Sequence, residues 1–131
     1  MPRWRGTIAV DDYVIDVLLR DITGHDKQPA AFLVYLWLYG QAARRRWRPV
    51  RAGLGAIAEA TGLSRSAVQS AMARLRDREL IATTREHRTA TPGHAVRRHW
   101  RDQGNSNLPE ATKRRQRSLP RRTWLLGQNS G

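Results

Sequence analysis

The chain has 131 residues, no cysteine and a formal net charge of +13 from 24 basic and 11 acidic residues. This length predicts one domain with tails, and the lack of cysteine excludes disulfides and thiolate zinc sites. Nearly all the basic residues are arginine, whose guanidinium group pairs bidentately with phosphate and guanine, so the composition favours a nucleic-acid partner. The longest apolar run, residues 30–39, is shorter than the roughly 20 residues of a membrane span.

Residues 1–28 are predicted to form a short basic arm followed by a first helix. The arm has no apolar run behind it, unlike a secretory signal, so we expect a cytoplasmic, nucleoid-associated protein. Asp11 or Asp12 is suited to cap the helix, which we expect to end at Thr23-Gly24. Its apolar face would consist of Val14, Val17 and Leu18.

A second helix is predicted from Pro29, which favours the first helical turn, to about Arg44. Residues 32–39 are apolar all round, so more than one face must be covered. The following helices would cover one face, and either a partner subunit or the first helix would cover another. We expect a homodimer, which would read paired half-sites, with an interface including Tyr35, Trp37, Leu38 or Tyr39.

A run of arginines follows this helix, before a short strand predicted at residues 49–51. Exposed arginines attract phosphates without regard to sequence. We therefore expect non-specific nucleic-acid contacts from Arg44, Arg45, Arg46 and Arg48.

Residues 54–61 and 64–78 are predicted to form two helices joined by a tight turn, a helix-turn-helix. Gly62 can take the left-handed conformation of such a turn, and Ser64 can cap the second helix. An apolar stripe at positions 68, 71, 72 and 75 would face the core. The opposite face would lie in the DNA major groove or, alternatively, be a solvated helix face. Its candidate DNA-binding residues are Ser64, Arg65, Ser66, Gln69, Ser70 and Arg74.

A hairpin is predicted next, with strands at residues 80–84 and 95–100 around a polar loop containing Pro92-Gly93. A hairpin placed directly after a recognition helix is typical of the wing of a winged helix. Three histidines lie nearby, but without cysteine or convergent carboxylates we predict no metal and no other cofactor. The expected contacts to phosphate or the minor groove are Arg85, His87, Arg88, Arg97 and Arg98.

The composition shifts at Arg101 to a linker-like, basic tail that runs to residue 131. Such a tail can add non-specific affinity for DNA, or bind RNA or a larger nucleoprotein complex, whereas solvated charge explains it equally well. Trp124 within it could dock. Its basic residues are Lys113, Arg114, Arg115, Arg117, Arg121 and Arg122.

Two nearby stretches of the sequence resemble bacterial winged helix-turn-helix regulators. They are Ile57-Ala58-Glu59-Ala60-Thr61-Gly62-Leu63-Ser64-Arg65-Ser66-Ala67-Val68 and Arg74-Leu75-Arg76-Asp77-Arg78-Glu79-Leu80-Ile81. The pattern is similar to those of gluconate-repressor-type regulators and of plasmid or phage replication initiators. The resemblance implies that residues 64–76 enter the major groove and that the wing touches backbone or minor groove. The family usually has glycine where this chain has Glu79.

The predicted fold is therefore mainly α with a small β-hairpin: a winged helix-turn-helix at residues 29–100, an N-terminal helical extension at 1–28 and a basic tail at 101–131. The favoured function is sequence-specific binding of double-stranded DNA by a small bacterial or mobile-element transcriptional regulator. The first alternative is a nucleic-acid-binding accessory subunit of a replication, transposition or RNA-guided complex. The second is a protein-interaction adaptor. No catalytic arrangement is visible, so we do not expect an enzyme.

Overall fold

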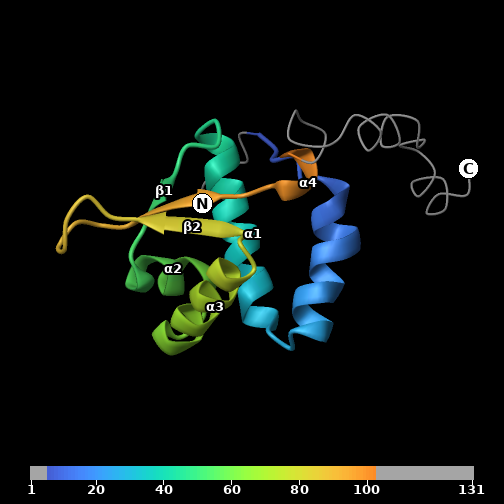
Figure 1. Cartoon of the computed structure of the whole chain (residues 1–131), viewed down its shortest axis with the longest axis horizontal. Helices are drawn as coiled ribbons and strands as arrows, with labels where there is room; N and C mark the ends of the chain where they lie inside the picture. The colour runs from blue at the N-terminus through green and yellow to red at the C-terminus, as the bar shows by residue number, and fades with distance from the viewer. Residues whose placement is uncertain (1–5, 103–131) are drawn as a thin grey trace, which may run out of the picture. The chain divides into compact units, whose positions relative to one another are not determined.

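The computed structural model describes residues 6–102, and the chain divides into two units, Met1–Arg97 and Arg98–Gly131. The first unit is mainly helical with a small three-stranded antiparallel sheet (Figure 1). Its helical and strand elements are η1 (Val14–Leu18), η2 (Asp21–His25), α1 (Pro29–Arg44), β1 (Val50–Arg51), α2 (Leu54–Thr61), α3 (Arg65–Asp77), β2 (Ile81–Thr84) and β3 (Gly93–Val96). The second unit begins with a short helix, α4 (His99–Asp102).

The N-terminal segment is helical from Asp12 to His25 and includes the two π-helical turns η1 and η2. Thr23 and Gly24 lie inside η2, so the predicted helix end at these residues is wrong. Residues four apart lie on the same face of a helix. The fully buried side chains of the segment are accordingly Val14, Leu18 and Ile22, whereas Val17 is half-buried.

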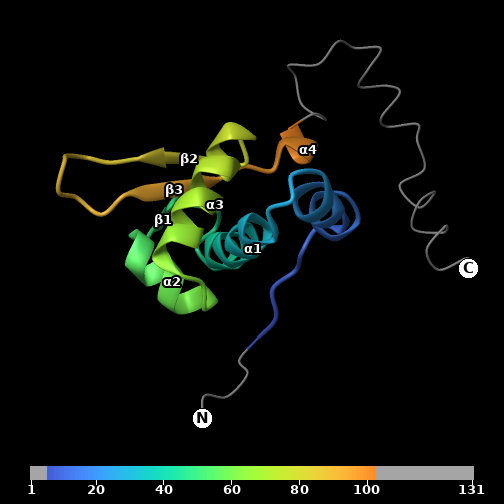
Figure 2. The same ribbon diagram turned by 90° about the horizontal axis from the view of Figure 1, so that it is seen from below.

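Helix α1 has the predicted bounds, beginning with Pro29 and ending at Arg44. It packs against η2, α2, α3 and the sheet, all from the same chain (Figure 2). Tyr35, Leu38 and Tyr39 are at most 1% exposed. These three residues, which were among the four expected to contribute to a dimer interface, are therefore covered within the chain, whereas the homodimer itself stays a prediction. Trp37 is half-buried.

The two helices α2 and α3 meet at the predicted turn. Gly62 has a φ of 80°, the left-handed conformation expected of it. The Ser64 hydroxyl accepts a hydrogen bond from the Ala67 amide at 3.1 Å and so caps α3. The predicted apolar stripe of α3 is buried: Val68, Ala71, Met72 and Leu75.

Helix α3 ends in a Schellman motif, which turns the chain into the hairpin. The Leu80 amide donates to the Leu75 carbonyl at 2.9 Å, and the Glu79 amide donates to the Arg76 carbonyl at 3.0 Å. Glu79 has a φ of 57°, at the position where such motifs usually place glycine. The motif is thus formed with a non-glycine residue in a left-handed conformation.

The sheet has the order β1-β3-β2, with both pairs antiparallel. Strand β3 begins at Gly93, paired with Thr84 and Arg51, and ends at Val96, so the predicted strand at residues 95–100 is wrong in both bounds. The Arg97 amide still donates to the Leu80 carbonyl at 2.8 Å, and the Arg97 carbonyl accepts from the Tyr35 hydroxyl at 2.9 Å. Beyond this point the chain leaves the sheet. Among residues 6–102, no helix combines the length and hydrophobicity that a bilayer crossing requires.

Candidate nucleic-acid interface

The side of α3 opposite its buried stripe carries short or polar side chains. Ser66, Gln69, Ser70 and Ala73 are all exposed. No side chain among these four is bulky, so a partner surface can come close to the helix backbone. Of these, Gln69 carries both a donor and an acceptor, the pair that recognises the adenine edge in the major groove.

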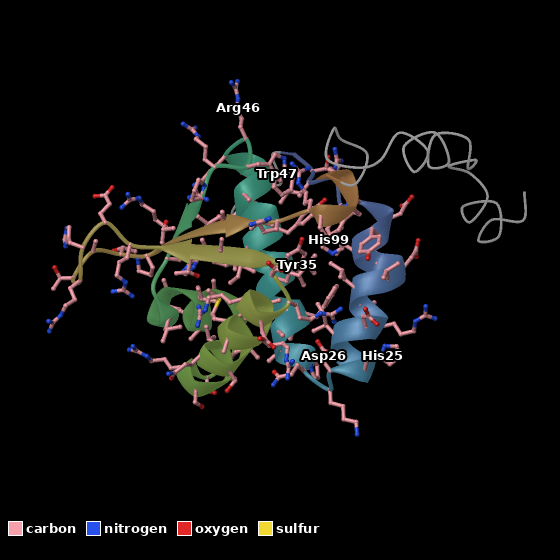
Figure 3. All side chains as sticks on the ribbon, in the orientation of Figure 1. His25, Asp26, Tyr35, Arg46, Trp47 and His99 are labelled. Atoms are coloured by element: carbon pink, nitrogen blue, oxygen red, sulfur yellow. The ribbon has the colours of Figure 1, made fainter. Side chains whose placement is uncertain are left out.

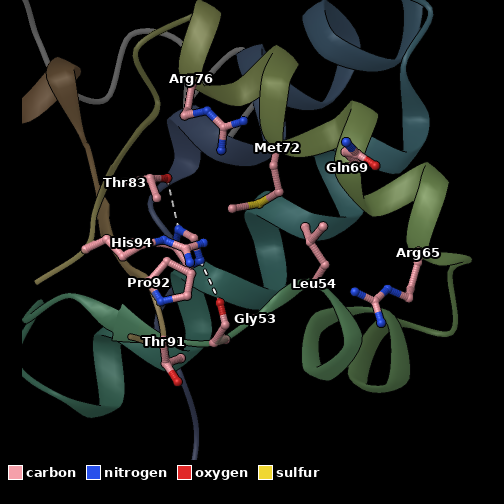
Figure 4. A pocket seen from close by; sticks show the side chains of 12 residues that line it. Gly53, Leu54, Arg65, Gln69, Met72, Arg76, Thr83, Thr91, Pro92 and His94 are labelled. Carbon is pink, nitrogen blue, oxygen red and sulfur yellow. Dashed lines mark hydrogen bonds between the residues drawn. The ribbon is translucent and has the colours of Figure 1, made fainter. Parts of the chain in front are cut away.

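One flank of α3 faces the hairpin across a cleft of about 440 Å³. We call it the hairpin flank; its residues are Arg65, Gln69 and Arg76. Arg85, just after β2, lines the opposite wall. The cleft thus gathers three arginines from two elements and has no acidic side chain in its lining (Figure 4). The other lining residues are Ala52, Gly53, Leu54, Met72, Thr83, Thr91, Pro92 and His94.

His94 is a buried polar residue at the base of this cleft, with 3% exposure. Its Nε2–H donates to the Ala52 carbonyl at 2.8 Å, because a carbonyl can only accept. In the neutral ring, Nδ1 then accepts from the Thr83 hydroxyl at 3.0 Å. These bonds join β3, β2 and the segment before α2. Burial, with smaller repulsion from Arg76 and Arg85, lowers the pKa of His94 and so favours the neutral ring.

The other flank of α3 faces the N-terminal segment, and its arginines are paired. We call it the aspartate flank. The Arg78 guanidinium, just after α3, contacts Asp26 Oδ2 and Asp21 Oδ2, each at 3.0 Å. Asp21 also contacts His25 Nδ1 at 2.6 Å, and the hydrogen bonds from His25 and Arg78 lower the pKa of Asp21. Arg74 is 3.6 Å from Asp77.

The six residues predicted on the recognition helix therefore do not form one surface. Arg65 and Gln69 line the cleft, whereas Ser70 and Arg74 line a separate depression that also contains Gln28. Ser66 lies on the exposed face between these flanks, beside the Ser64 hydroxyl at 3.3 Å. Ser64 itself caps the helix.

The predicted wing residues are also spread out. Arg85 lines the cleft and donates to the Arg88 carbonyl at 3.0 Å, while His87 and Arg88 are exposed in the loop. Arg97 is exposed just after β3, next to the end of α3 rather than in the loop. Arg98 belongs to the second unit.

Sequence reasoning missed Arg76, which lines the cleft with Arg65 and Gln69. Arg76 follows these two residues by eleven and seven positions, which is helical spacing. That spacing could have identified it. Thr83 and His94 gave no comparable signal, because their place in the cleft depends on the register of β2 with β3.

The predicted non-specific arginines at residues 44–48 form a turn at the C-terminal end of α1, here called the basic turn. Arg44, Arg45, Arg46 and Arg48 are exposed. Figure 3 shows Arg46 pointing away from the rest of the unit. Trp47 packs edge-on against Tyr39 with ring centroids 4.8 Å apart. The predicted tail contacts, from Lys113 to Arg122 and Trp124, lie outside the described residues.

Within residues 6–102, no group of three histidine, aspartate or glutamate side chains is placed to hold a metal ion. In comparisons with known proteins, no family model, curated protein or solved structure matches the chain.

Proposed function

We propose that this protein binds double-stranded DNA in a sequence-specific manner as a small winged helix-turn-helix transcriptional regulator. In this proposal α3 is the recognition helix, and its exposed face lies in the major groove. The hairpin β2–β3 is the wing and contacts the DNA backbone. The protein performs no catalysis of its own.

The observation that carries the proposal is the arrangement of arginines around the cleft. Arg65, Arg76 and Arg85 converge from α3 and the hairpin with no carboxylate among them. Their charges are not neutralised by ion pairs among the described residues. Phosphates in this cleft would fix the register of a duplex, and Gln69 in the same lining would then meet base edges.

The charge distribution also argues against the adaptor alternative. Residues 44–97 contain twelve arginines against four acidic residues. Protein interfaces are centred on apolar and aromatic side chains. The exposed face of α3 has neither large apolar residues nor aromatic ones, so it suits a polar, anionic partner better.

The test is a binding selection from random duplexes at about 0.15 M salt, because specificity is interpretable only at a stated salt concentration. The full chain should enrich a short motif. The variant Arg65→Gln/Arg76→Gln should enrich none, while the matched variant Arg20→Gln/Lys27→Gln, on the N-terminal segment, should enrich the same motif. A chain that enriches no motif, or prefers single-stranded RNA over every duplex, would refute the proposal.

A further inference from the structure

The basic turn lies on a different side of the first unit from the face proposed to bind DNA. Helix α1 has 16 residues, so it is about 24 Å long, and the turn lies at its C-terminal end. In Figure 1, α2 and α3 lie below the sheet and the turn lies above it. Figure 2, viewed from below, places α3 in front. A straight duplex on the exposed face of α3 would therefore not reach the turn.

The backbone of the turn has an unusual conformation and local contacts that support it. Arg46 and Trp47 have φ values of 55° and 66°, two successive left-handed residues that are not glycine. Each such residue costs about 1 kcal/mol or more. The Trp47 amide donates to the Ala42 carbonyl at 2.7 Å, and the Trp47 ring packs on Tyr39. The bond from Trp47 to Ala42 spans five residues, as in a helix C-terminal motif, so these contacts fix the course of the chain at the end of α1.

The charge of the turn is not neutralised by its surroundings. Arg45 donates to the carbonyl and side-chain oxygens of Gln41 at 3.3 and 3.2 Å, and Arg48 donates to the Arg45 carbonyl at 3.2 Å. All these acceptors are uncharged, and no ion pair links the turn to a carboxylate of the described residues. The C-terminus of α1 supplies only about half a negative charge. Four arginines exceed what helix capping requires.

We infer that the basic turn is a second nucleic-acid-binding surface, which contacts the phosphate backbone of a segment other than the one bound at α3. One chain would then join two nucleic-acid segments. The inference rests on the proposed function for the first segment only. A nucleic acid fits better than an acidic protein, because the one aromatic side chain of the turn, Trp47, is occupied by Tyr39 and the remaining exposed groups are guanidinium groups, which suit phosphates.

The test measures bridging and single-duplex binding in parallel. A duplex fixed to beads captures a second, fluorescent duplex through the full-length protein, and fluorescence anisotropy measures binding of one duplex. The test variant is Arg44→Gln/Arg46→Gln, because neither side chain makes a hydrogen bond or ion pair with another described residue. The matched control is Arg20→Gln/Lys27→Gln, which removes two exposed charges elsewhere. Circular dichroism checks that each variant is folded.

The test variant should capture at least about tenfold less of the fluorescent duplex, since each lost phosphate contact weakens binding about eightfold near 0.1 M salt. Its affinity for a single duplex should stay near that of the control. Retained bridging would overturn the inference, because bridging would then not depend on the basic turn but on another surface, such as the paired α3 faces of a dimer. An equal loss of both readings would also overturn it, because the turn would then contact the same duplex. Single-duplex binding that is insensitive to Arg65→Gln/Arg76→Gln would refute the proposed function instead.

Discussion

The two flanks of α3 carry the same residue type in opposite roles. On the aspartate flank, Arg78 is held between Asp21 and Asp26, and its side chain is 28% exposed. On the hairpin flank, Arg65 and Arg76 face a cleft without acids. Arg76 and Arg78 are only two residues apart, so helix geometry alone sends one to each side. An arginine paired by its own chain stabilises the fold, whereas an arginine left without a carboxylate is available to an external anion.

The largest expected effect comes from the three arginines that line the cleft between the hairpin flank and the hairpin. Replacing Arg65, Arg76 and Arg85 with glutamine should lower duplex affinity by about two to three orders of magnitude near 0.1 M salt and flatten the slope of log affinity against log salt by about 2.7. Anisotropy titrations at several salt concentrations would measure both. The melting temperature should change little, because none of these side chains pairs with a carboxylate. An unchanged slope would remove the distinction between the two flanks.

The aspartate flank should respond in the opposite way. Arg78→Gln leaves Asp21 and Asp26 partly buried without their cation, which should lower the free energy of unfolding by about 1–3 kcal/mol. Urea denaturation would measure this loss. DNA affinity should remain within about twofold at temperatures where the variant is folded. A variant of full stability and weak DNA binding would place Arg78 in the interface.

His94 makes the free energy of unfolding depend on pH. Because burial lowers its pKa in the folded chain, its contribution to stability is complete above the unfolded pKa of about 6.5 and is lost progressively as the pH falls below that value. Denaturation midpoints measured between pH 5 and 8 should therefore fall on acidification. His94→Gln should flatten this trend, while the exposed control His87→Gln should keep it. A steep trend in both variants would assign the effect to other groups.

The smallest expected effect concerns the turn from α3 into the hairpin. Glu79→Gly should raise the free energy of unfolding by about 0.5–1 kcal/mol, since glycine adopts the left-handed conformation without steric cost. Glu79→Ala serves as the control, because it removes the carboxylate but retains the unfavourable φ. Thermal denaturation of both variants would check this. Stabilisation by alanine as large as that by glycine would indicate relief of charge rather than of backbone strain.

Local signals made much of the helical framework predictable. Pro29, Gly62 and Ser64 mark helix bounds through their own conformational preferences or capping groups, and the structure has α1, α2 and α3 where those signals placed them. The continuation of the N-terminal helix past Gly24 was not predictable in this way. A distant residue, Arg78, pairs with Asp21 and Asp26 at this end of the segment, and such a pairing gives no local signal in the sequence.

The candidate site was only partly predictable for the same reason. Helical periodicity identified which residues of α3 are exposed, including Gln69, but not which flank faces the hairpin. That choice follows from the register of β2 with β3 and from the bonds of His94 to Thr83 and Ala52. Which elements cover the apolar faces of α1 also depended on tertiary packing. Of the two alternatives that the sequence left open, a partner subunit or the first helix of the same chain, the structure has the same-chain arrangement.

The most direct test of the central claim is the effect of Gln69→Ala on two duplexes at one salt concentration. One duplex carries the motif enriched from random sequences, and the other carries the same bases in scrambled order. If α3 reads base edges through Gln69, affinity for the motif should fall by about 1–3 kcal/mol while affinity for the scrambled duplex stays the same. Equal losses on both duplexes, or no loss on either, would contradict the claim that this face of α3 recognises DNA sequence.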